Sequence, residues 1–403
     1  MKVCFETFGC RLNRAEALDE EARCAAAGHE IVKTHAEADI VVVRGCSVTA
    51  RAQRDSERLV AHIRRKYPLV KVLVEGCLRE RRGEDSTLTA ETRRLVFAQP
   101  GTEGAVPTRT ARAYLKVQDG CNSSCTFCIV PQFRGKASSV PFAAALDRAK
   151  RFVDAGYHEI VVTGCNLSQY ASDGKGFADL VAALAELDAG CRIRLGSLEP
   201  CAGAAETVAA VAEHANVCRF LHLPIQSGSD RLLMAMRRPY RLREVNALVA
   251  EARRRMPEVG LGCDLMTGFP GETELDHASS VGLLKRLPFS NVHVFPFSER
   301  PGTQACVLAH SVPKELRSSR AHELSRRAAH NRHVFAERFL GRTVEVVIED
   351  EAHLAGWTGE YLWCEAMNLS DAGTDRALWR RKSIVKVSVQ KASHEGILKG
   401  KIV

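Results

Sequence analysis

The sequence contains the stretch Gly120-Cys121-Asn122-Ser123-Ser124-Cys125-Thr126-Phe127-Cys128, in which three cysteines follow the spacing C-x3-C-x2-C. Three thiolates this close together can each ligate a different iron of a cubane iron–sulfur cluster, which normally takes four cysteine ligands. The fourth iron would then have no protein ligand. Because the ligands and their surroundings set the chemistry of such a centre, an open coordination position indicates a catalytic cluster.

Two other interpretations of this stretch are a zinc site and a set of buried cysteines. Free cysteine is often buried as a small apolar side chain. Zinc sites usually combine one C-x2-C pair with a second pair ~15 residues further on. No second pair follows Cys128, so we favour the cluster.

Length and composition indicate an ordinary globular protein of several domains. The chain has 403 residues, 45% hydrophobic and 26% charged, enough for two or three separate cores. No apolar run approaches the ~18 residues of a membrane span, and the amino terminus lacks a signal-peptide pattern. We therefore expect a cytoplasmic protein without a membrane partner. The 15 cysteines then favour metal binding over disulfides.

The net charge of +9 suits a polyanionic partner, since each lysine or arginine placed at a phosphate releases a counterion. Arginines cluster at 253–255, 326–327 and 380–381. Taken alone, the signal is weak, because most such arginines solvate the face of a helix.

Residues 1–85 alternate between strand and helix patterns. The valine-rich runs at residues 3–7, 40–43 and 70–74 are typical of buried parallel strands. Helical spacing covers residues 13–27 and 50–66. The pattern predicts a doubly wound parallel sheet.

A Gly-Cys pair follows each of these strands, which places Cys10, Cys46 and Cys77 at three loops. The carboxyl ends of parallel strands open on one edge of a sheet, so the three cysteines should converge there. A glycine before each cysteine permits a tight turn and a close approach to a cofactor. The sequence therefore predicts a second iron–sulfur cluster.

Residues 86–112 are polar, contain Pro100-Gly101 and Pro107, and read as a linker. From 113 to 335 the chain repeats a strand-then-helix unit, which predicts a partial (β/α)6 barrel with its active site at the carboxyl ends of the strands. The expected strands are residues 114–118, 159–163, 192–196, 220–224, 260–266 and 291–295. Polar, glycine-bearing segments follow them and predict one shared pocket.

Residues 336–403 read as a small all-β module. Expected strands cover 344–348, 361–365, 384–389 and 397–402, and the expected turn glycines are Gly356, Gly359, Gly373 and Gly396. Such a module fits a compact barrel of the kind that binds oligonucleotides. The alternative is a structural cap without a ligand.

Together these features resemble the radical S-adenosylmethionine (SAM) methylthiotransferase family over nearly the whole chain. The resemblance includes the three N-terminal cysteines, the cysteines at 121, 125 and 128, a β-module similar to a TRAM domain, and the strings at 222–230, 264–272 and 294–303. Residues 7–13 and 46–49 are most similar to the branch that modifies N6-threonylcarbamoyladenosine at position 37 of tRNA.

The resemblance implies two 4Fe-4S clusters, held by the two cysteine trios, and two SAM molecules per turnover. One SAM would methylate a sulfur at the cluster of Cys10, Cys46 and Cys77. The other would yield a 5′-deoxyadenosyl radical that activates C2 of adenine. No catalytic residue beyond the cluster ligands is expected, and the implied SAM contacts are Thr163, Gly164, Asn166, Ser197, Glu199 and Gln226.

The partners implied by the resemblance are the tRNA anticodon loop, a reducing electron donor and a sulfur source. Related branches act on N6-isopentenyladenosine in tRNA or on an aspartate of a ribosomal protein. A non-enzymatic alternative is an iron–sulfur RNA-binding redox sensor. The chain departs from the family pattern at Arg44-Gly45, where Asn-Thr is usual, and in its short interval from Cys77 to Cys121. His222 and His293 lie on apolar strands and read as core or pocket-wall residues rather than ligands.

Overall fold

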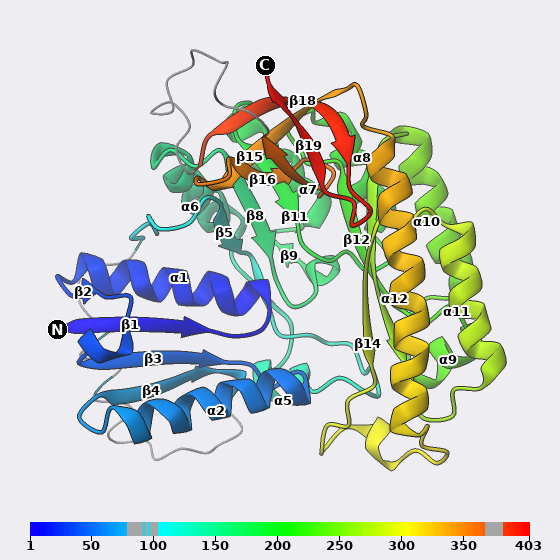
Figure 1. The fold of residues 1–403 in the computed structure, drawn as a ribbon, viewed down its shortest axis with the longest axis horizontal. Coiled ribbons are helices and arrows are strands. Elements are labelled where there is room, and N and C mark those ends of the chain that lie inside the picture. The colour runs from blue at the N-terminus through cyan, green and yellow to red at the C-terminus, as the bar shows by residue number, and fades with distance from the viewer. Residues whose placement is uncertain (79–91, 93–95, 97–103, 367–381) are drawn as a thin grey trace.

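The computed structural model describes residues 1–78, 92, 96, 104–366 and 382–403. It shows three units: a parallel sheet with flanking helices, a larger β/α core and a C-terminal β-barrel (Figure 1). The predicted fold class is confirmed. Most of the predicted linker lies outside the described residues. No helix that the structure describes is long and apolar enough to cross a lipid bilayer.

The N-terminal unit is a parallel sheet in the order β2-β1-β3-β4. Its elements are β1 (Lys2–Thr7), α1 (Arg11–Ala26), β2 (Glu30–Ile31), β3 (Ile40–Gly45), α2 (Ala50–Lys66) and β4 (Lys71–Gly76). Side chains alternate between the two faces of β3, because successive residues of a strand point in opposite directions. Val41 and Val43 therefore share a core with Ile63 of α2, whereas Val42 shares one with Cys24 of α1. The two helices cover opposite faces (Figure 1).

The core contains all six predicted strands. They are β5 (Ala113–Lys116), β8 (Glu159–Thr163), β11 (Arg192–Leu195), β12 (Phe220–Gln226), β13 (Gly260–Thr267) and β14 (Asn291–Pro296). The helices are α5 (Val130–Arg134), α6 (Phe142–Asp154), α7 (Phe177–Leu187), α8 (Ala204–Glu213), α9 (Asp230–Ala235), α10 (Leu242–Arg255), α11 (Glu274–Arg286) and α12 (Lys314–Glu337). Short strand pairs form between β6 (Gln118–Asp119) and β7 (Ser138–Ser139), and between β9 (Ala171–Ser172) and β10 (Lys175–Gly176).

The core strands form two parallel sheets, β11-β8-β5 and β12-β13-β14. Only isolated bridges join them, at Ile193–Val217 and Ser197–His222. The result is a partial barrel whose strands all run the same way. Their carboxyl ends therefore open at one end of the barrel.

The C-terminal unit is a closed barrel in the order β15-β16-β17-β19-β18. Its strands are β15 (Thr343–Asp350), β16 (Ala355–Thr358), β17 (Trp363–Ala366), β18 (Ile384–Ala392) and β19 (Leu398–Ile402). Helix α12 runs along the core, and Phe335 in its last turn and Phe339 just after it belong to the hydrophobic centre of the barrel.

The prediction that Gly356 lies in a turn is wrong, because it lies within β16. A Cβ atom at this position would stand 1.7 Å from the carbonyl oxygen of Val347. Glycine is needed here because β15 and β16 approach closely beside an irregularity in their register. The same glycine made this segment resemble a turn in the sequence, so β16 was not predicted. Gly396 does lie in a turn, with φ of 76°. Gly373 lies outside the described residues.

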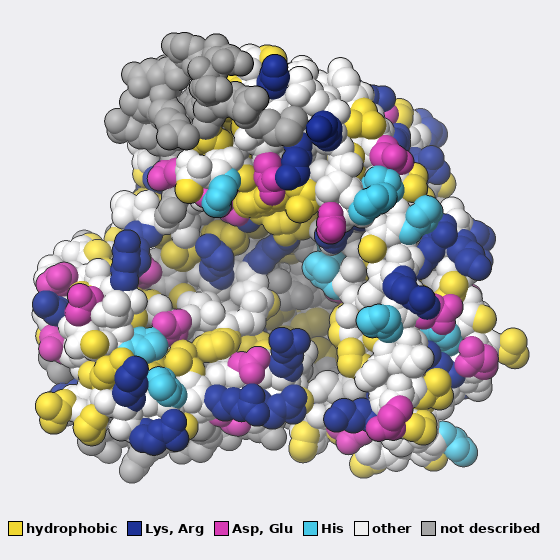
Figure 2. All heavy atoms as spheres, in the orientation of Figure 1, with side chains coloured by type: hydrophobic (Ala, Val, Ile, Leu, Met, Phe, Trp, Pro, Cys, Tyr) yellow, Lys and Arg dark blue, Asp and Glu magenta, His cyan; other side chains and the backbone are white. Residues whose placement is uncertain are grey.

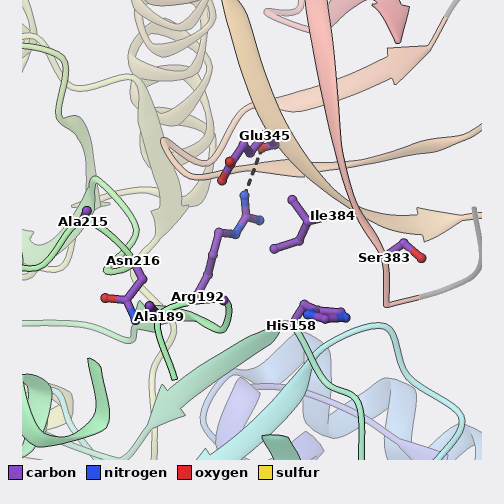
Figure 3. A pocket seen from close by; sticks show the side chains of 9 residues that line it. His158, Ala189, Arg192, Ala215, Asn216, Glu345, Ser383 and Ile384 are labelled. Carbon is purple, nitrogen blue, oxygen red and sulfur yellow. Dashed lines mark hydrogen bonds between the residues drawn. The ribbon is translucent and has the colours of Figure 1, made fainter. Parts of the chain in front are cut away.

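A buried carboxylate fastens the C-terminal barrel to the amino end of the core strands. Glu159, with no exposed surface, accepts hydrogen bonds from Arg192 (2.5 and 3.1 Å) and from Arg194 (2.7 and 3.1 Å). Arg194 also donates to the carbonyl of Thr358 at 2.7 Å. Arg192 donates to the carbonyl of Glu345 at 2.9 Å, beside a cavity of about 570 Å³ between the two units (Figure 3).

Glu159→Gln should destabilise the protein by about 3–5 kcal/mol, because it leaves buried guanidinium groups without their counter-ion. Burial raises the pKa of Glu159, but the charges of Arg194 and Arg192 outweigh it and hold the pKa below its ordinary value. The difference in free energy of unfolding between the wild type and Glu159→Gln should therefore be complete above pH ~4.3 and become smaller as the pH falls further. Chemical denaturation at several pH values measures this, with the exposed Glu213→Gln as a control. Equal stability at pH 7 would contradict it.

Candidate functional site

The three-cysteine loop lies at the carboxyl end of the barrel, between β6 and α5. Gly120 begins it with φ of 63°, and a Cβ atom there would lie 2.0 Å from the carbonyl oxygen of Lys136. Only glycine therefore permits this turn. The loop borders a cavity of about 750 Å³, which is also lined by α5 residues and by residues 302–304 from the loop after β14.

A buried arginine lies against this loop. Arg238 donates to the Sγ of Cys125 at 3.1 Å, to Glu199 at 2.6 Å and to the hydroxyl of Tyr240 at 2.8 Å. Its side chain is 5% exposed. A positive charge and an N–H donor beside a ligand sulfur are among the features that set the potential of an iron–sulfur centre.

Burial makes these thiols hard to ionise in the protein without metal. It raises the pKa of Cys128 to about 12, with the charges of Cys125 and Cys121 acting in the same direction. Burial also raises the pKa of Cys125, although Arg238 opposes this. Metal ligation must release these protons.

The six residues implied as SAM contacts lie at the carboxyl ends of the neighbouring strands β8, β11 and β12. Asn166 donates to the Sγ of Cys121 at 3.8 Å, a long contact that places it beside the cysteine loop. Asn166 Oδ1 and Gln226 Oε1 are buried and have no hydrogen-bond partner among the residues that the structure describes. Buried polar atoms are normally paired, so both oxygens fit acceptors waiting for a polar ligand such as SAM.

The other four predicted contacts lie at the end of β8 or just after β8 and β11. Thr163 ends β8, and Glu199 is held by Arg238. Ser197 is exposed and pairs with His222. A Cβ atom on Gly164 would lie 2.9 Å from the side chain of Gln118. Of the six residues, Asn166 contacts Cys121, and Glu199 is linked to Cys125 through Arg238.

The N-terminal cysteines lie together at the edge of their sheet. Cys10 directly precedes α1, Cys46 follows β3, and Cys77 follows β4. A Cβ atom on Gly9 would lie 2.7 Å from the Sγ of Cys46. Burial raises the pKa of Cys46, and the charges of Cys10 and Cys77 raise it further. A Cβ atom on Gly76, next to Cys77, would lie 2.8 Å from the carbonyl oxygen of Gly45, so all three loops meet at the Gly45-Cys46 step.

Neither trio is arranged for a single ion. Within the part of the chain that the structure describes, two groups of three ligands have all donor atoms within 4.8 Å of one another: Cys4–Glu6–His35 and His222–Asp264–His293. The two cysteine trios are more widely spaced. Wider spacing suits a cluster in which each thiolate binds its own iron, and it disfavours the zinc alternative.

Arg134 connects the two cysteine regions. It lies on α5, directly after the loop of Cys128, and lines a cavity of about 520 Å³ together with Cys77. It donates to Glu16 at 3.0 Å and to Asn13 at 2.7 Å, both on α1. Burial lowers its pKa, but the hydrogen bond and charge of Glu16, and the charge of Cys77, outweigh burial and raise it.

The loop after β14 makes a second connection. Arg300 donates to the carbonyl of Ser47, next to Cys46, and to Gln53 at 2.6 Å. Two residues further on, Gly302 and Thr303 line the cavity of the Cys121–Cys128 loop. One short segment thus contacts the surroundings of both trios.

Sequence reasoning missed Gln118, Arg134, Arg238 and Arg300. Gln118, fully buried, accepts from the backbone N–H of Asn166 at 2.8 Å and donates to the carbonyl of Gly120 at 2.8 Å. It therefore ties two site loops together. The sequence does not single out Arg134 or Arg238, because an arginine in a polar segment normally predicts a solvated surface. Arg300 lies within the string 294–303, in a segment predicted to border the shared pocket, but no role was assigned to it.

Comparisons with known proteins agree with this geometry. The family model described as the Radical SAM superfamily matches residues 115–284. The model described as Uncharacterized protein family UPF0004 matches residues 2–98. The two matches cover the core strands β5 to β13 and the N-terminal sheet.

Relatives resemble the chain over most of its length. Threonylcarbamoyladenosine tRNA methylthiotransferase MtaB of Thermotoga maritima is 30% identical over 376 residues, covering 86% of each chain. tRNA-2-methylthio-N(6)-dimethylallyladenosine synthase of Chlorobium phaeovibrioides is 32% identical, covering 88% of each. The radical SAM methyltransferase TsrM of Kitasatospora setae superposes with a TM-score of 0.56 at 13% identity, covering 76% of this chain and 75% of that one. This last likeness concerns the fold alone.

The barrel, its three-cysteine loop and these matches define a radical SAM enzyme, a class whose fold implies a 4Fe-4S cluster and SAM. Within this class, the chain belongs to the radical SAM methylthiotransferase family. Membership of an enzyme family favours catalysis over the sensor alternative.

Arg238→Gln should make the potential of the iron–sulfur centre more negative, because it removes a positive charge and an N–H donor beside Cys125. Arg238→Lys keeps the charge and should shift the potential less. An EPR-monitored redox titration of the anaerobically reconstituted protein measures this effect. Arg243→Gln, whose side chain is 91% exposed, is the matched control. An unchanged potential in Arg238→Gln would show that the contact does not tune the centre.

Proposed function

We propose that this enzyme adds a methylthio group to C2 of N6-threonylcarbamoyladenosine at position 37 of tRNA, using two 4Fe-4S clusters. Cys121, Cys125 and Cys128 would hold one cluster, and Cys10, Cys46 and Cys77 the other. The observation that supports this most strongly is the joining of the two cysteine regions by Arg134 and by residues 300–303. A reaction that uses both centres on one substrate needs them in one place.

When bound, the clusters and SAM supply the reactive chemistry, namely reductive cleavage of SAM to a 5′-deoxyadenosyl radical and delivery of a methylated sulfur. The chain's residues would position these groups. Asn166 and Gln226 would accept hydrogen bonds from SAM through their unpaired oxygens. Glu199, oriented by Arg238, would contact the ribose. Thr163, Gly164 and Ser197 would complete the contacts.

The nucleoside assignment follows the relatives named MtaB. The second candidate is N6-isopentenyladenosine (dimethylallyladenosine), because the relative named for that nucleoside has the higher identity of the two compared, 32% against 30%. An electron donor and a sulfur source are required partners in both cases.

The surface supports a polyanionic substrate. The molecule is hollowed where the three units meet, and Lys and Arg side chains lie around this hollow (Figure 2). Exposed lysines also lie on the C-terminal barrel, at Lys386 and Lys391 of β18 and at Lys401 of β19. The barrel contacts the loop of Cys10 through the hydrogen bond of Arg11 to Tyr361, and a barrel of the oligonucleotide-binding kind suits a loop base that must leave its stack for chemistry.

Mass spectrometry of tRNA nucleosides from cells with and without the gene tests this function. We expect the methylthio derivative of N6-threonylcarbamoyladenosine to disappear when the gene is removed. Loss of the isopentenyladenosine derivative instead would support the second candidate. Unchanged methylthio-adenosines would contradict both and favour a protein substrate.

Variants of the two cysteine trios should affect different steps of the reaction. Cys46→Ala should retain SAM cleavage to 5′-deoxyadenosine but lose methylthio transfer, whereas Cys125→Ala should lose both. The assay is anaerobic incubation with SAM, dithionite and tRNA, with iron content measured in parallel. Cys24→Ala, which removes a buried thiol bonded to the Val96 carbonyl, is the control and should retain both activities. Full methylthio transfer by Cys46→Ala would refute the second cluster.

The double variant Lys391→Ala/Lys401→Ala should bind tRNA more weakly. Each lost phosphate contact should also flatten the slope of log affinity against log salt by roughly 0.7–0.9. Fluorescence anisotropy with labelled tRNA at several salt concentrations measures this. Lys71→Ala, at the amino end of β4, should leave binding unchanged. A slope equal to that of the wild type would argue against tRNA contact at β18 and β19.

A further inference from the structure

Three polar side chains meet on the inner face of the core barrel, on neighbouring strands. His222 lies on β12, Asp264 on β13 and His293 on β14. In the strand register, His293 lies directly opposite Asp264, and His222 lies opposite Gly262, two residues before Asp264. Alternation places all three on the face opposite to Leu223 and Cys263, which pack in the hydrophobic core beneath the helices.

The donor atoms of the three side chains converge. His222 Nε2 lies 3.0 Å from Asp264 Oδ1, and His293 Nδ1 lies 3.1 Å from the same oxygen. The two imidazole rings are 5.2 Å apart between centroids. All three donor atoms lie within 4.8 Å of one another, which the two cysteine trios do not achieve.

A glycine on β13, Gly262, makes this arrangement possible. A Cβ atom on Gly262 would lie 2.6 Å from Nδ1 of His222 and 2.7 Å from the ring of Phe220. The imidazole of His222 thus occupies the space beside Gly262 and reaches Asp264 at the next inward position of β13. With any larger residue at position 262, the ring would have to move away from Asp264.

The group is open on one side. The side chain of His222 is 8% exposed, that of Asp264 22% and that of His293 57%. His293 is therefore not a core residue, contrary to one of the two roles expected from its apolar strand. Any ion held by the three side chains would keep coordination positions open toward solvent or substrate.

Two imidazoles and one carboxylate form a ligand set that suits divalent first-row transition metals, and three protein ligands leave positions for water or a substrate oxygen. We propose that His222, Asp264 and His293 bind one divalent transition-metal ion on the inner face of the barrel. The site uses none of the six cluster cysteines, so it stands independently of the function proposed above.

Manganese(II) is the probe for this site, because it prefers oxygen and imidazole ligands and discriminates against the cysteine thiolates. The holoprotein, kept oxidised and anaerobic, is titrated with Mn²⁺ while the EPR signal of free Mn²⁺ is followed. We expect one bound Mn²⁺ per chain, with nitrogen coupling from imidazole in the pulsed EPR spectrum. His293→Gln and Asp264→Asn should each weaken binding by at least about tenfold.

The controls separate a lost ligand from a lost fold. His293 is mostly exposed, so His293→Gln should retain the stability and iron content of the wild type. His35→Gln, in the comparable group formed with Cys4 and Glu6, should bind Mn²⁺ as the wild type does. Absence of bound Mn²⁺ at millimolar concentration would overturn the proposal. Equal affinity in the wild type, His293→Gln and Asp264→Asn would also overturn it.

Discussion

A carboxylate with no exposed surface cannot remain charged without partners, and the ion cluster around Glu159 is the constraint on which the arrangement of the units depends. Arg192 and Arg194 bind Glu159 and at the same time donate to backbone carbonyls of the C-terminal barrel. Arg112 joins them at 3.6 Å from Glu159 and also bonds Glu349 of β15. The amino end of the core barrel is therefore covered, and chemistry is directed to the carboxyl end. A buried ion cluster contributes little net stability, but it defines where the C-terminal barrel sits.

The carboxyl end is organised by a second set of charges, which belong to the junction with the N-terminal sheet. Glu16 of α1 binds Arg134, Lys116 and Arg44, at 3.0, 2.6 and 2.7 Å. Arg44 belongs to the Arg44-Gly45 pair at which this chain departs from the family pattern, and here it forms an ion pair with Glu16 that joins β3 to α1. Arg11, directly after Cys10, donates to the hydroxyl of Tyr361 in the C-terminal unit at 2.7 Å. The N-terminal loop is thus held by both other units.

The sequence predicted the features that depend on local pattern. Valine runs revealed the parallel strands, and the Gly-Cys pairs revealed where the loops of Cys10, Cys46 and Cys77 would converge. The contacts that complete the site join residues far apart in the chain, such as Arg238 with Cys125 and Arg300 with Ser47. The hydrophobic periodicity of a sequence gives no information about such long-range contacts. From sequence alone, a single arginine is predicted to lie on the surface, and only the fold shows that its surroundings are buried. Likewise, the proximity of His222 to Gly262 and Asp264 follows from the register of β12 against β13, which the sequence does not give.

The placement of two arginines explains why the N-terminal cysteine region cannot be understood from its own unit alone. Burial raises the pKa of Cys125 and Cys46, and so opposes the thiolate form that metals require. Arg238 lies against Cys125, and Arg134 lines the same cavity as Cys77. Both arginines belong to the core. The N-terminal unit supplies three thiols, and beside Cys77 its own Arg44 is joined by Arg134 of the core, which Glu16 of the N-terminal helix holds in place. One positive charge beside the N-terminal trio therefore comes across the junction from the core, so this trio has all its neighbouring charges only when the two units are docked.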